Sequence, residues 1–371
     1  MATSATTVTA LERDLLDAAR GGDEDAYRRL VEPHRRALHA HCYRMLGSVH
    51  DAEDALQDAL LRAWRGLPRF EGRSSLRSWL YRIATNASLN AIERRPRRML
   101  PIDHGPPADP HDPPGAPLVE CTWVEPYPDE QLGLVDGRAA PEARYERREG
   151  VELAFVAALQ LLPPNQRAAL ILREVLGFSG QEIAEALETT VAAVNSALQR
   201  ARRAVDERLP DRTQQATLRA LGDQRLREVV ESYMDAMSRG DVDAVVSLLA
   251  QDAVWSMPPL GDWYRGSDEI AVFLARAPLN GNWHWRHLPA HASGQAAVGS
   301  YISDAKDGTY RAFALDVLTL RGDRIADITS FINRTTQLRD GDDFLQWPHY
   351  PADPARASAY FAAFGLPDAL D

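Results

Sequence analysis

Residues 190–203 of this chain carry side chains that can read base pairs in duplex DNA. Asn195 and Gln199 have amides, which can pair with adenine through two hydrogen bonds, and Arg200 has a guanidinium that can pair with guanine. Ser196 can bond to several base edges. The two arginines nearer the end of the segment, Arg202 and Arg203, can hold phosphates and set the register. The alternative is the solvated polar face of an ordinary bundle helix.

Three short helices over residues 162–205 must position these side chains. Gly177 suits the left-handed end of the first helix, and Ser179 with Glu182 forms a capping box that starts the second. Thr190 is the expected N-cap of the third helix, and we count it among the candidate DNA contacts. A buried stripe at helical spacing follows: Val194, Leu198, Ala201 and Val205. The capped second helix and the tight turn favour a helix-turn-helix over a plain bundle.

Length and composition predict a multidomain cytoplasmic protein. At 371 residues the chain is too long for one ordinary domain, and 45% hydrophobic residues are ample for packed cores. Its two cysteines, Cys42 and Cys121, cannot build a disulfide framework, which fits a reducing compartment. The first ten residues lack the features of a signal peptide, and no apolar run is long enough for a membrane span.

The net charge of −11 is unusual for a protein that binds DNA. Residues 1–95 carry +2, residues 96–141 carry −5, residues 142–209 carry −1 and residues 210–371 carry −7. Neutralisation of phosphates supplies most non-specific affinity for DNA. We therefore expect weak binding by the chain alone and a partner that places it on DNA.

Residues 11–95 are predicted to be all-helical. A helix that follows Ser48 or Asp51 carries a core stripe on one face: Ala52, Leu56, Ala59, Leu60 and Ala63. Its other face combines acidic and amide groups with an apolar residue: Asp51, Asp54, Gln57, Asp58 and Leu61, with Arg65 beyond them. This face is either a docking surface for a basic partner or a plain solvated face.

A loop at residues 68–75 leads into a predicted helix over residues 76–94. The helix interleaves aromatic, cationic and amide side chains: Arg77, Trp79, Tyr81, Arg82 and Asn86. Aromatic rings beside arginines can stack unpaired bases, at roughly 1–3 kcal/mol per base. The alternative is that Trp79 and Ile83 belong to the core.

Taken together, three segments resemble an extracytoplasmic-function (ECF) RNA polymerase sigma factor. They are RFEGRSSLRSWLYRIATNASLNAIERRPRR, the DAEDALQDALLRAWR helix and the helix-turn-helix, in matching order over residues 10–210. The resemblance implies an all-α sigma domain 2 at residues 10–98, which binds the β′ clamp helices of RNA polymerase core and melts the −10 element. It also implies an all-α sigma domain 4 at residues 142–209, which reads the −35 element and binds the β flap.

The resemblance assigns three sets of residues. The polymerase-binding set is Asp51, Asp54, Gln57, Asp58 and Leu61. The −10 set is Phe70, Arg73, Ser74, Ser75, Trp79, Arg82 and Asn86. The −35 set is Thr190, Asn195, Ser196, Gln199, Arg200, Arg202 and Arg203.

Residues 99–141 form a predicted linker that is acidic and rich in proline, with few residues to build a core. The phrases WVEPYPD and PEARYERRE resemble the sigma-G-like branch of the family. In a sigma factor this linker threads toward the active-site cleft and the RNA exit channel. The alternative is a passive tether.

About 160 residues follow the sigma part. Helices followed by a strand hairpin predict an α+β domain at residues 222–340, and DAVWSMPP resembles the SnoaL-like fold shared with ketosteroid isomerase, which has a conical pocket. The candidate pocket residues are Tyr233, Trp255, Met257, Trp263, Trp285, His287, Phe313, Asp316 and Phe331. The alternative is that the aromatic residues are core. The aromatic tail, residues 341–371, is expected to pack back.

These features predict a sigma factor regulated by its fused C-terminal domain, acting by binding and without catalytic residues, metal or cofactor. Its partners are RNA polymerase core and promoter DNA, with a small-molecule ligand of the C-terminal domain left open and no membrane. One alternative is a one-component helix-turn-helix regulator with a ligand-binding domain, which leaves residues 1–95 unexplained. Another is a SnoaL-like enzyme fused to a DNA-binding module, with Asp316 as its base.

Overall fold

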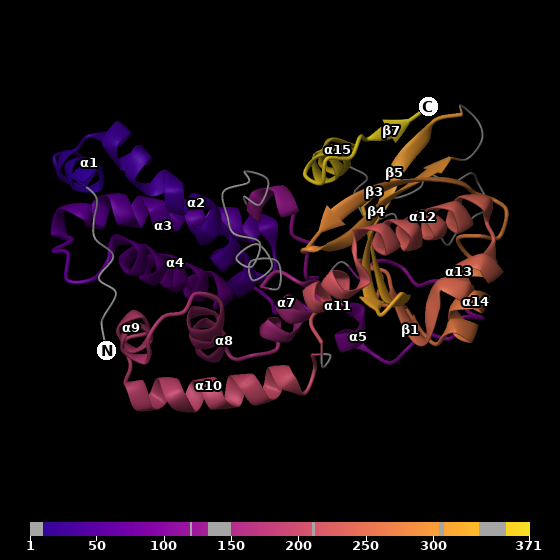
Figure 1. Cartoon of the computed structure of the whole chain (residues 1–371), viewed down its shortest axis with the longest axis horizontal. Helices are drawn as coiled ribbons and strands as arrows, with labels where there is room; N and C mark the ends of the chain where they lie inside the picture. Colours follow the sequence, from indigo (N-terminus) through magenta and orange to yellow (C-terminus); the bar gives the residue numbers. More distant parts are fainter. Residues whose placement is uncertain (1–9, 119–120, 133–149, 210–211, 304–307, 334–353) are drawn as a thin grey trace. The chain divides into compact units, whose positions relative to one another are not determined.

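The structure is a computed structural model, and it describes residues 10–118, 121–132, 150–209, 212–303, 308–333 and 354–371. The chain forms two compact units (Figure 1). The helical unit comprises residues 1–97, 131–133 and 158–208, and the sheet unit comprises the rest. Residues 133–149 and 334–353 lie outside the described residues. The predicted boundary between the linker and domain 4 and the predicted start of the tail fall within these two ranges.

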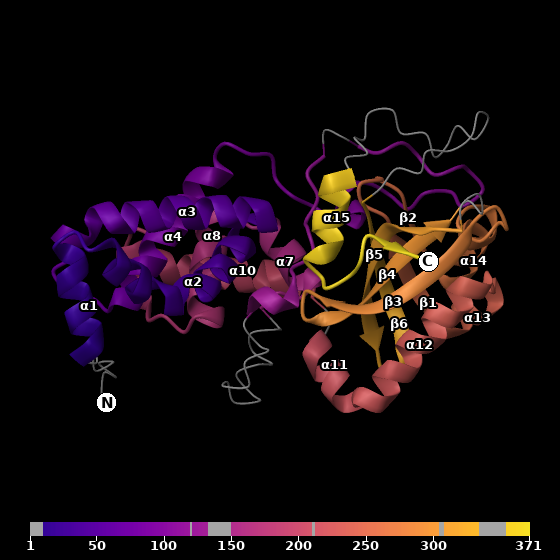
Figure 2. The same ribbon diagram turned by 90° about the horizontal axis from the view of Figure 1, so that it is seen from above.

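The first part of the helical unit is a bundle of packed helices. They are α1 (Ala10–Arg20), α2 (Glu24–Leu46), α3 (Val49–Gly66) and α4 (Leu76–Ile92), with a 3₁₀ turn η1 (Leu67–Arg69). In Figure 2, α3 runs beside α2 and α4, and it packs on both. The side chains of Asp23, Ser48 and Ser75 cap α2, α3 and α4 by accepting backbone N–H groups. α2 is one long helix that continues through Pro33 and ends at Gly47.

The predicted helix-turn-helix is present in the second part of the helical unit. Its elements are α8 (Pro164–Leu170), a π-helical turn η3 (Ile171–Val175), α9 (Gly180–Ala186) and α10 (Val191–Asp206). The preceding helix, α7 (Leu153–Gln160), spans the boundary of the two units, which falls between Ala157 and Ala158. The capping box of Ser179 and Glu182 is formed, and Gly177 is left-handed with φ 71°. The Thr190 side chain accepts from the Ala193 N–H, and the four stripe residues of α10 are buried.

The sheet unit has an α+β fold, as expected. Its helices are α11 (Gln214–Leu221), α12 (Asp223–Arg239), α13 (Val242–Leu248), α14 (Ser267–Arg276) and α15 (Pro354–Ala362). Its strands are β1 (Leu249–Ser256), β2 (Trp263–Arg265), β3 (His284–Ala292), β4 (Gln295–Ser303), β5 (Tyr310–Arg321), β6 (Arg324–Ile332) and β7 (Ala369–Leu370). The order is β2-β1-β6-β5-β4-β3, with β7 on β5, and β1 pairs with β6 in parallel while the other pairs are antiparallel.

Successive side chains of each strand point to opposite faces of the sheet. One face packs with α12, α13 and α14 around a large core that includes Trp255, Val298 and Leu318. We call this side the inner face. The other side carries Tyr301, whose ring meets Phe361 of α15 at 5.6 Å and whose hydroxyl donates to the Pro367 carbonyl at 2.9 Å. We call it the outer face.

Residues 98–130 do not behave as a coreless linker. They include α5 (Pro101–His104), and the turn η2 (Asp129–Leu132) follows at their end. Trp123, Val124 and Tyr127 are all buried. Backbone hydrogen bonds tie Met99 to Thr122 and Val124, and Tyr127 to Ser293. The expectation was wrong because the segment pairs with itself and with the sheet unit: Met99 pairs with Trp123, Pro128 pairs with Ala292, and Ala108 packs against the large core.

None of the described helices combines the length and the apolar composition needed to cross a membrane.

Candidate nucleic-acid interface

A groove of about 1080 Å³ lies along α10. Four of the predicted −35 residues line it: Asn195, Gln199, Arg202 and Arg203. All four are exposed, because the buried stripe fixes the opposite side of the helix. Four further polar residues line the same groove and were not predicted: Arg173 of η3, Gln181 of α9, and the acidic residues Asp206 and Glu207 at the end of α10. Their position depends on how the three elements pack, which no local pattern shows.

The other three predicted −35 residues do not line this groove. Ser196 and Arg200 are exposed on α10 beside it, and the Thr190 hydroxyl is occupied as the N-cap. Thr190 therefore has a structural task whatever else it contacts.

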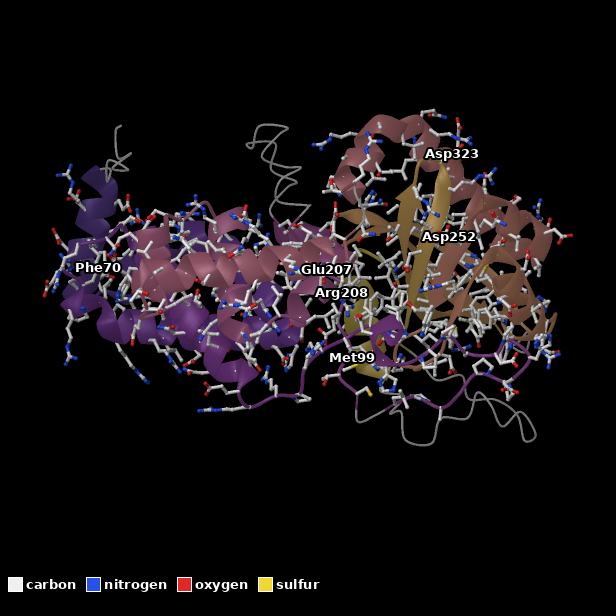
Figure 3. All side chains as sticks on the ribbon, turned by 90° about the horizontal axis from the view of Figure 1, so that it is seen from below. Phe70, Met99, Glu207, Arg208, Asp252 and Asp323 are labelled. Carbon is white, nitrogen blue, oxygen red and sulfur yellow. The ribbon has the colours of Figure 1, made fainter. Side chains whose placement is uncertain are left out.

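Two arginines of the groove are held by carboxylates of the chain itself. Arg202 donates to Glu174 Oε1 from Nε at 3.1 Å and from Nη2 at 2.5 Å. Arg203 Nε donates to Glu207 Oε1 at 3.0 Å, near the labelled end of α10 in Figure 3. Any phosphate at this groove must compete with these pairs, which are largely solvated and hence weak.

A second groove, of about 330 Å³, lies on the N-terminal bundle. Three of the predicted −10 residues meet there: Trp79, Arg82 and Asn86. Arg62 of α3 and Arg69 of η1 join them and were missed, because they come from other elements. Three guanidinium groups, an amide and an indole around one cavity suit a base and its phosphate.

The stacking platform predicted on α4 is only partly available. Trp79 is 8% exposed, and its ring centroid lies 4.8 Å from that of Phe70, which is also buried. Tyr81 is buried at 3%. Both aromatic residues of α4 are thus mainly core, which the alternative stated for Trp79 and not for Tyr81. Ile83, the other residue that the alternative assigned to the core, is only partly buried and lines the groove.

The loop that precedes α4 has mixed roles. Ser75 caps α4 through its hydroxyl, which accepts from the Ser78 N–H at 3.0 Å. Arg73 pairs with Glu71 at 2.5 Å, and both are largely exposed. Ser74 is exposed. Arg73 and Ser74 can therefore contact DNA without disturbing the bundle, whereas Ser75 and Phe70 are part of it.

The predicted acidic face of α3 loses one member. Asp51 is 7% exposed and forms an ion pair with Arg95, so it is not a surface group. The sequence did not show this, because Arg95 lies more than forty residues further along the chain. Leu61 is 55% exposed, Gln57 is exposed, and Asp54 and Asp58 are about half exposed.

In the sheet unit, Asp316 points to the inner face as the strand alternation suggested. Its Oδ2 accepts from the Tyr233 hydroxyl at 3.1 Å and from the Ser300 hydroxyl at 2.8 Å. Trp255 Nε1 donates to Ser330, which bonds to Asp316. Burial raises the pKa of Asp316, and the hydrogen bonds from Ser330, Ser300 and Tyr233 oppose that shift.

The other candidate pocket residues divide between the two faces. Trp285 stacks on His287 at 6.2 Å and meets Phe313 edge-on at 5.6 Å, and Met257 lies in the same inner core. Trp263 pairs with Ser256 and Phe331 with Leu315, which places both on the outer face. Trp263 and Phe331 therefore cannot line a pocket on the inner face. The face of each residue follows from the register of the strand pairs, which the sequence of a single strand does not show.

Three family models match consecutive parts of the chain. They are Sigma-70 region 2 over residues 30–98, Sigma-70 region 4 over residues 152–205 and a SnoaL-like domain over residues 230–328. The two grooves fall in the first two regions, and the sheet falls in the third. The fold and the sites thus define a two-region sigma factor with a SnoaL-like domain.

Relatives narrow the class. The chain is 40% identical to the ECF RNA polymerase sigma factor SigG of Mycobacterium tuberculosis over 355 residues, 95% of this chain and 86% of the relative. It is 31% identical to the RNA polymerase sigma-H factor of Pseudomonas aeruginosa over 198 residues, 53% of this chain and 93% of that protein. The crystal structure of Mycobacterium tuberculosis SigJ matches with 25% identity and a TM-score of 0.49, over 81% of this chain and 95% of that one. The chain belongs to the ECF RNA polymerase sigma factors, which bind RNA polymerase core and promoter DNA.

Proposed function

We propose that the two grooves divide promoter recognition between them. The α10 groove takes the duplex of the −35 element, with Asn195 and Gln199 at base edges and the arginines at phosphates. The Trp79–Arg82–Asn86 groove takes an unpaired base of the −10 element. The exposed acids and Leu61 of α3 dock on the β′ clamp helices, and the region that contains α8 and α9 meets the β flap. The site of action is the chromosome, in the cytoplasm.

The observation that carries this proposal is the pair of grooves, each built from base-reading amides and arginines. The test is a reconstituted holoenzyme on promoter DNA with single base changes. Asn195→Ala should relax base choice only at the −35 element, and Asn86→Ala should weaken only opening at the −10 element. If either variant changed selectivity at the other element, the assignment of the grooves would be wrong.

We further propose that the SnoaL-like domain regulates the factor through residues 98–130. This segment is hydrogen-bonded to the domain along its length. Ala108 N–H donates to the Trp263 carbonyl, and Trp263 Nε1 donates to the Gly105 carbonyl, both at 2.9 Å. Gly115 N–H donates to Asp262 Oδ2 at 2.5 Å.

Further contacts hold the middle and the end of the segment. Leu118 N–H donates to the Pro259 carbonyl at 3.0 Å, and Gly294 N–H donates to Asp129 at 2.7 Å. The Leu118 side chain also packs over Gly261, where an added Cβ would lie 2.6 Å from its Cδ1. A linker held in this way cannot follow another path until the domain releases it.

Promoter output tests this regulation. Removal of residues 211–371 should change transcription in the reconstituted assay, because the linker then loses its partner. Trp263→Phe should shift output in the same direction by a smaller amount, since it removes one hydrogen bond and keeps the ring. Unchanged output for both variants, with and without candidate small molecules, would contradict the proposal.

We propose no catalytic role for Asp316. Its carboxylate already accepts hydrogen bonds from groups of the core, which makes it a satisfied structural acid. Asp316→Asn should therefore lower stability without removing a turnover. A small-molecule ligand of the inner face has to displace core side chains such as Trp285 and Phe313, so the test is ligand-dependent exchange of their backbone amides.

A further inference from the structure

The α10 groove contains an apolar side chain that the promoter contacts proposed above do not explain. Among the described residues, the large hydrophobic side chains that are exposed are Leu61, Ile102 and Val191. Leu61 belongs to the face of α3 proposed for the β′ clamp helices, and Ile102 lies on α5, outside both grooves. Val191 is 38% exposed and lines the α10 groove itself, together with Asn195 and Gln199. A valine among base-reading amides needs an explanation of its own.

Val191 lies at the end of α10 where base contacts are expected. It is the first residue of the helix, directly after the N-cap Thr190. In helix-turn-helix proteins the N-terminal residues of the recognition helix contact the base edges. Asn195 follows Val191 by four positions, so the two side chains lie on the same side of the helix. Arg202, which we propose as a phosphate contact, lies about three turns further along.

The side chain of Val191 is held on its concealed side by α9. Its Cγ1 atom lies where a Cβ added to Gly180, the first residue of α9, would contact it at 3.5 Å. Figure 1 shows α9 beside the start of α10, and the two helices pack on each other. A branched Cβ also leaves valine one strongly preferred rotamer in a helix. The exposed part of the side chain is therefore held in one orientation, and a contact with DNA costs little side-chain entropy.

The chemistry of an isopropyl group selects one feature of the major groove. Valine has neither a donor nor an acceptor in its side chain, so it cannot bond to the polar edges of the bases. The apolar group that a base pair presents in the major groove is the C5-methyl of thymine. We propose that Val191 reads the methyl group of a thymine in the −35 element. This inference rests on the proposed role of the α10 groove.

Spacing along α10 places this thymine near the base pair that Asn195 reads. Residues four apart on a helix have Cβ atoms ~5–6 Å apart, and successive base pairs are ~3.4 Å apart. The methyl group read by Val191 therefore lies within about two base pairs of the pair that Asn195 contacts. An amide that pairs with adenine beside a valine that contacts thymine gives this part of the element a preference for A·T pairs.

Removal of single methyl groups from the DNA tests this contact. Holoenzyme reconstituted with the full chain first selects its preferred −35 sequence from duplexes randomised at that element. Each thymine of the selected sequence is then replaced in turn by deoxyuridine, which lacks only the C5-methyl. We expect one replacement, close to the position that Asn195→Ala relaxes, to weaken binding about fourfold, which corresponds to ~0.8 kcal/mol for one buried methyl-sized group.

Variants assign the methyl effect to Val191. Val191→Ala removes both γ carbons and favours the helix, so it should reduce the fourfold effect to nearly none, and Val191→Ile should retain it. The salt dependence of binding should stay the same in both variants, because no phosphate contact is lost. Ile102→Ala shortens an apolar side chain of equal exposure, 38%, outside the groove and is the matched control.

Two outcomes would overturn the proposal. One is a selected element in which no deoxyuridine replacement near the Asn195-dependent position weakens binding. The other is a methyl effect of the same size in Val191→Ala as in the parent chain. In either case the −35 role of the groove would stand as long as Asn195→Ala still relaxed base choice. If Asn195→Ala left base choice unchanged, the promoter role of the groove itself would be refuted.

Discussion

Each residue of α10 that we propose as a DNA contact owes its exposure to the packing of its neighbours. Val194 and Leu198 are packed away, and this leaves Asn195 and Gln199 exposed one position further along. The amides do not need to be held by bonds of their own. Packing of the buried stripe turns the opposite side of α10 to solvent, so the amides are exposed and available to a base edge.

Removal of either amide should weaken discrimination at one base pair. For Asn195→Ala and Gln199→Ala we expect a loss of about 1–3 kcal/mol each in binding of the holoenzyme to the correct −35 sequence over a mismatched one. Competition binding on labelled promoter DNA measures the difference. Gln224→Ala, which removes an exposed amide of α12, should leave it unchanged.

The ion pair between Arg202 and Glu174 ties up a guanidinium that we propose as a phosphate contact. Glu174→Gln removes the carboxylate that Arg202 contacts at 2.5 Å, so Arg202 becomes available to a phosphate. We expect tighter promoter binding and a steeper dependence on salt, by up to about one released ion. A salt titration of holoenzyme binding checks this, with Glu185→Gln on α9 as the control. An unchanged slope would show that Arg202 does not reach the backbone.

At the scale of elements, strand β6 carries a carboxylate in an unfavourable place. Burial raises the pKa of Asp327 to about 6, although the Thr329 hydroxyl donates to it at 3.0 Å and opposes the shift. The folded state therefore binds this proton more tightly than the unfolded state does. The contribution of Asp327 to the free energy of unfolding should rise as the pH falls through 6 toward 4.

Asp327→Asn should remove this dependence. The variant should be more stable than the parent by about 1–3 kcal/mol near pH 7.5. The difference should shrink as the pH falls through 6 and vanish only below about pH 4, where the carboxyl is protonated in the unfolded state as well. Thermal unfolding followed by tryptophan fluorescence reports on the right unit, because six of the eight tryptophans lie in residues 98–371. If the difference in stability between the variant and the parent stayed constant across that pH range, the stabilisation would come from packing and not from the charge of Asp327.

Elements were predictable where their signals are local. The capping box at Ser179, the left-handed Gly177 and the stripe of α10 follow from spacing within a few residues. The burial of Asp51 was not predictable, because it depends on Arg95 from another segment. The prediction that Trp263 and Phe331 line the pocket was wrong for a similar reason. The alternation of a strand shows which residues share a face, but it does not show which face meets the helices.

At the scale of the molecule, the sequence indicated the three regions and their order but not what binds the segment between the first two. A stretch so rich in proline reads as a tether. Its packing depends on acceptors more than a hundred residues away, such as Asp262.

The hold on the linker can be measured directly. Trp263→Phe deletes the hydrogen bond to the Gly105 carbonyl, worth about 1 kcal/mol, and should speed hydrogen exchange at residues 105–108 about fivefold. Trp285→Phe is the control, since it deletes a similar bond to the Pro278 carbonyl. Faster exchange of the linker in both variants would indicate general loosening of the domain.

Gly299 of β4 has a consequence for the far end of the chain. A Cβ at this position would lie 2.6 Å from Leu366 Cδ1, so the leucine occupies space that any other residue would fill. An alanine there would force the Leu366 side chain to turn aside and would loosen its packing, while the ladder between β4 and β5 stayed paired. The close seat of Leu366 on the sheet thus uses space that only a residue without a side chain leaves open in the middle of a strand.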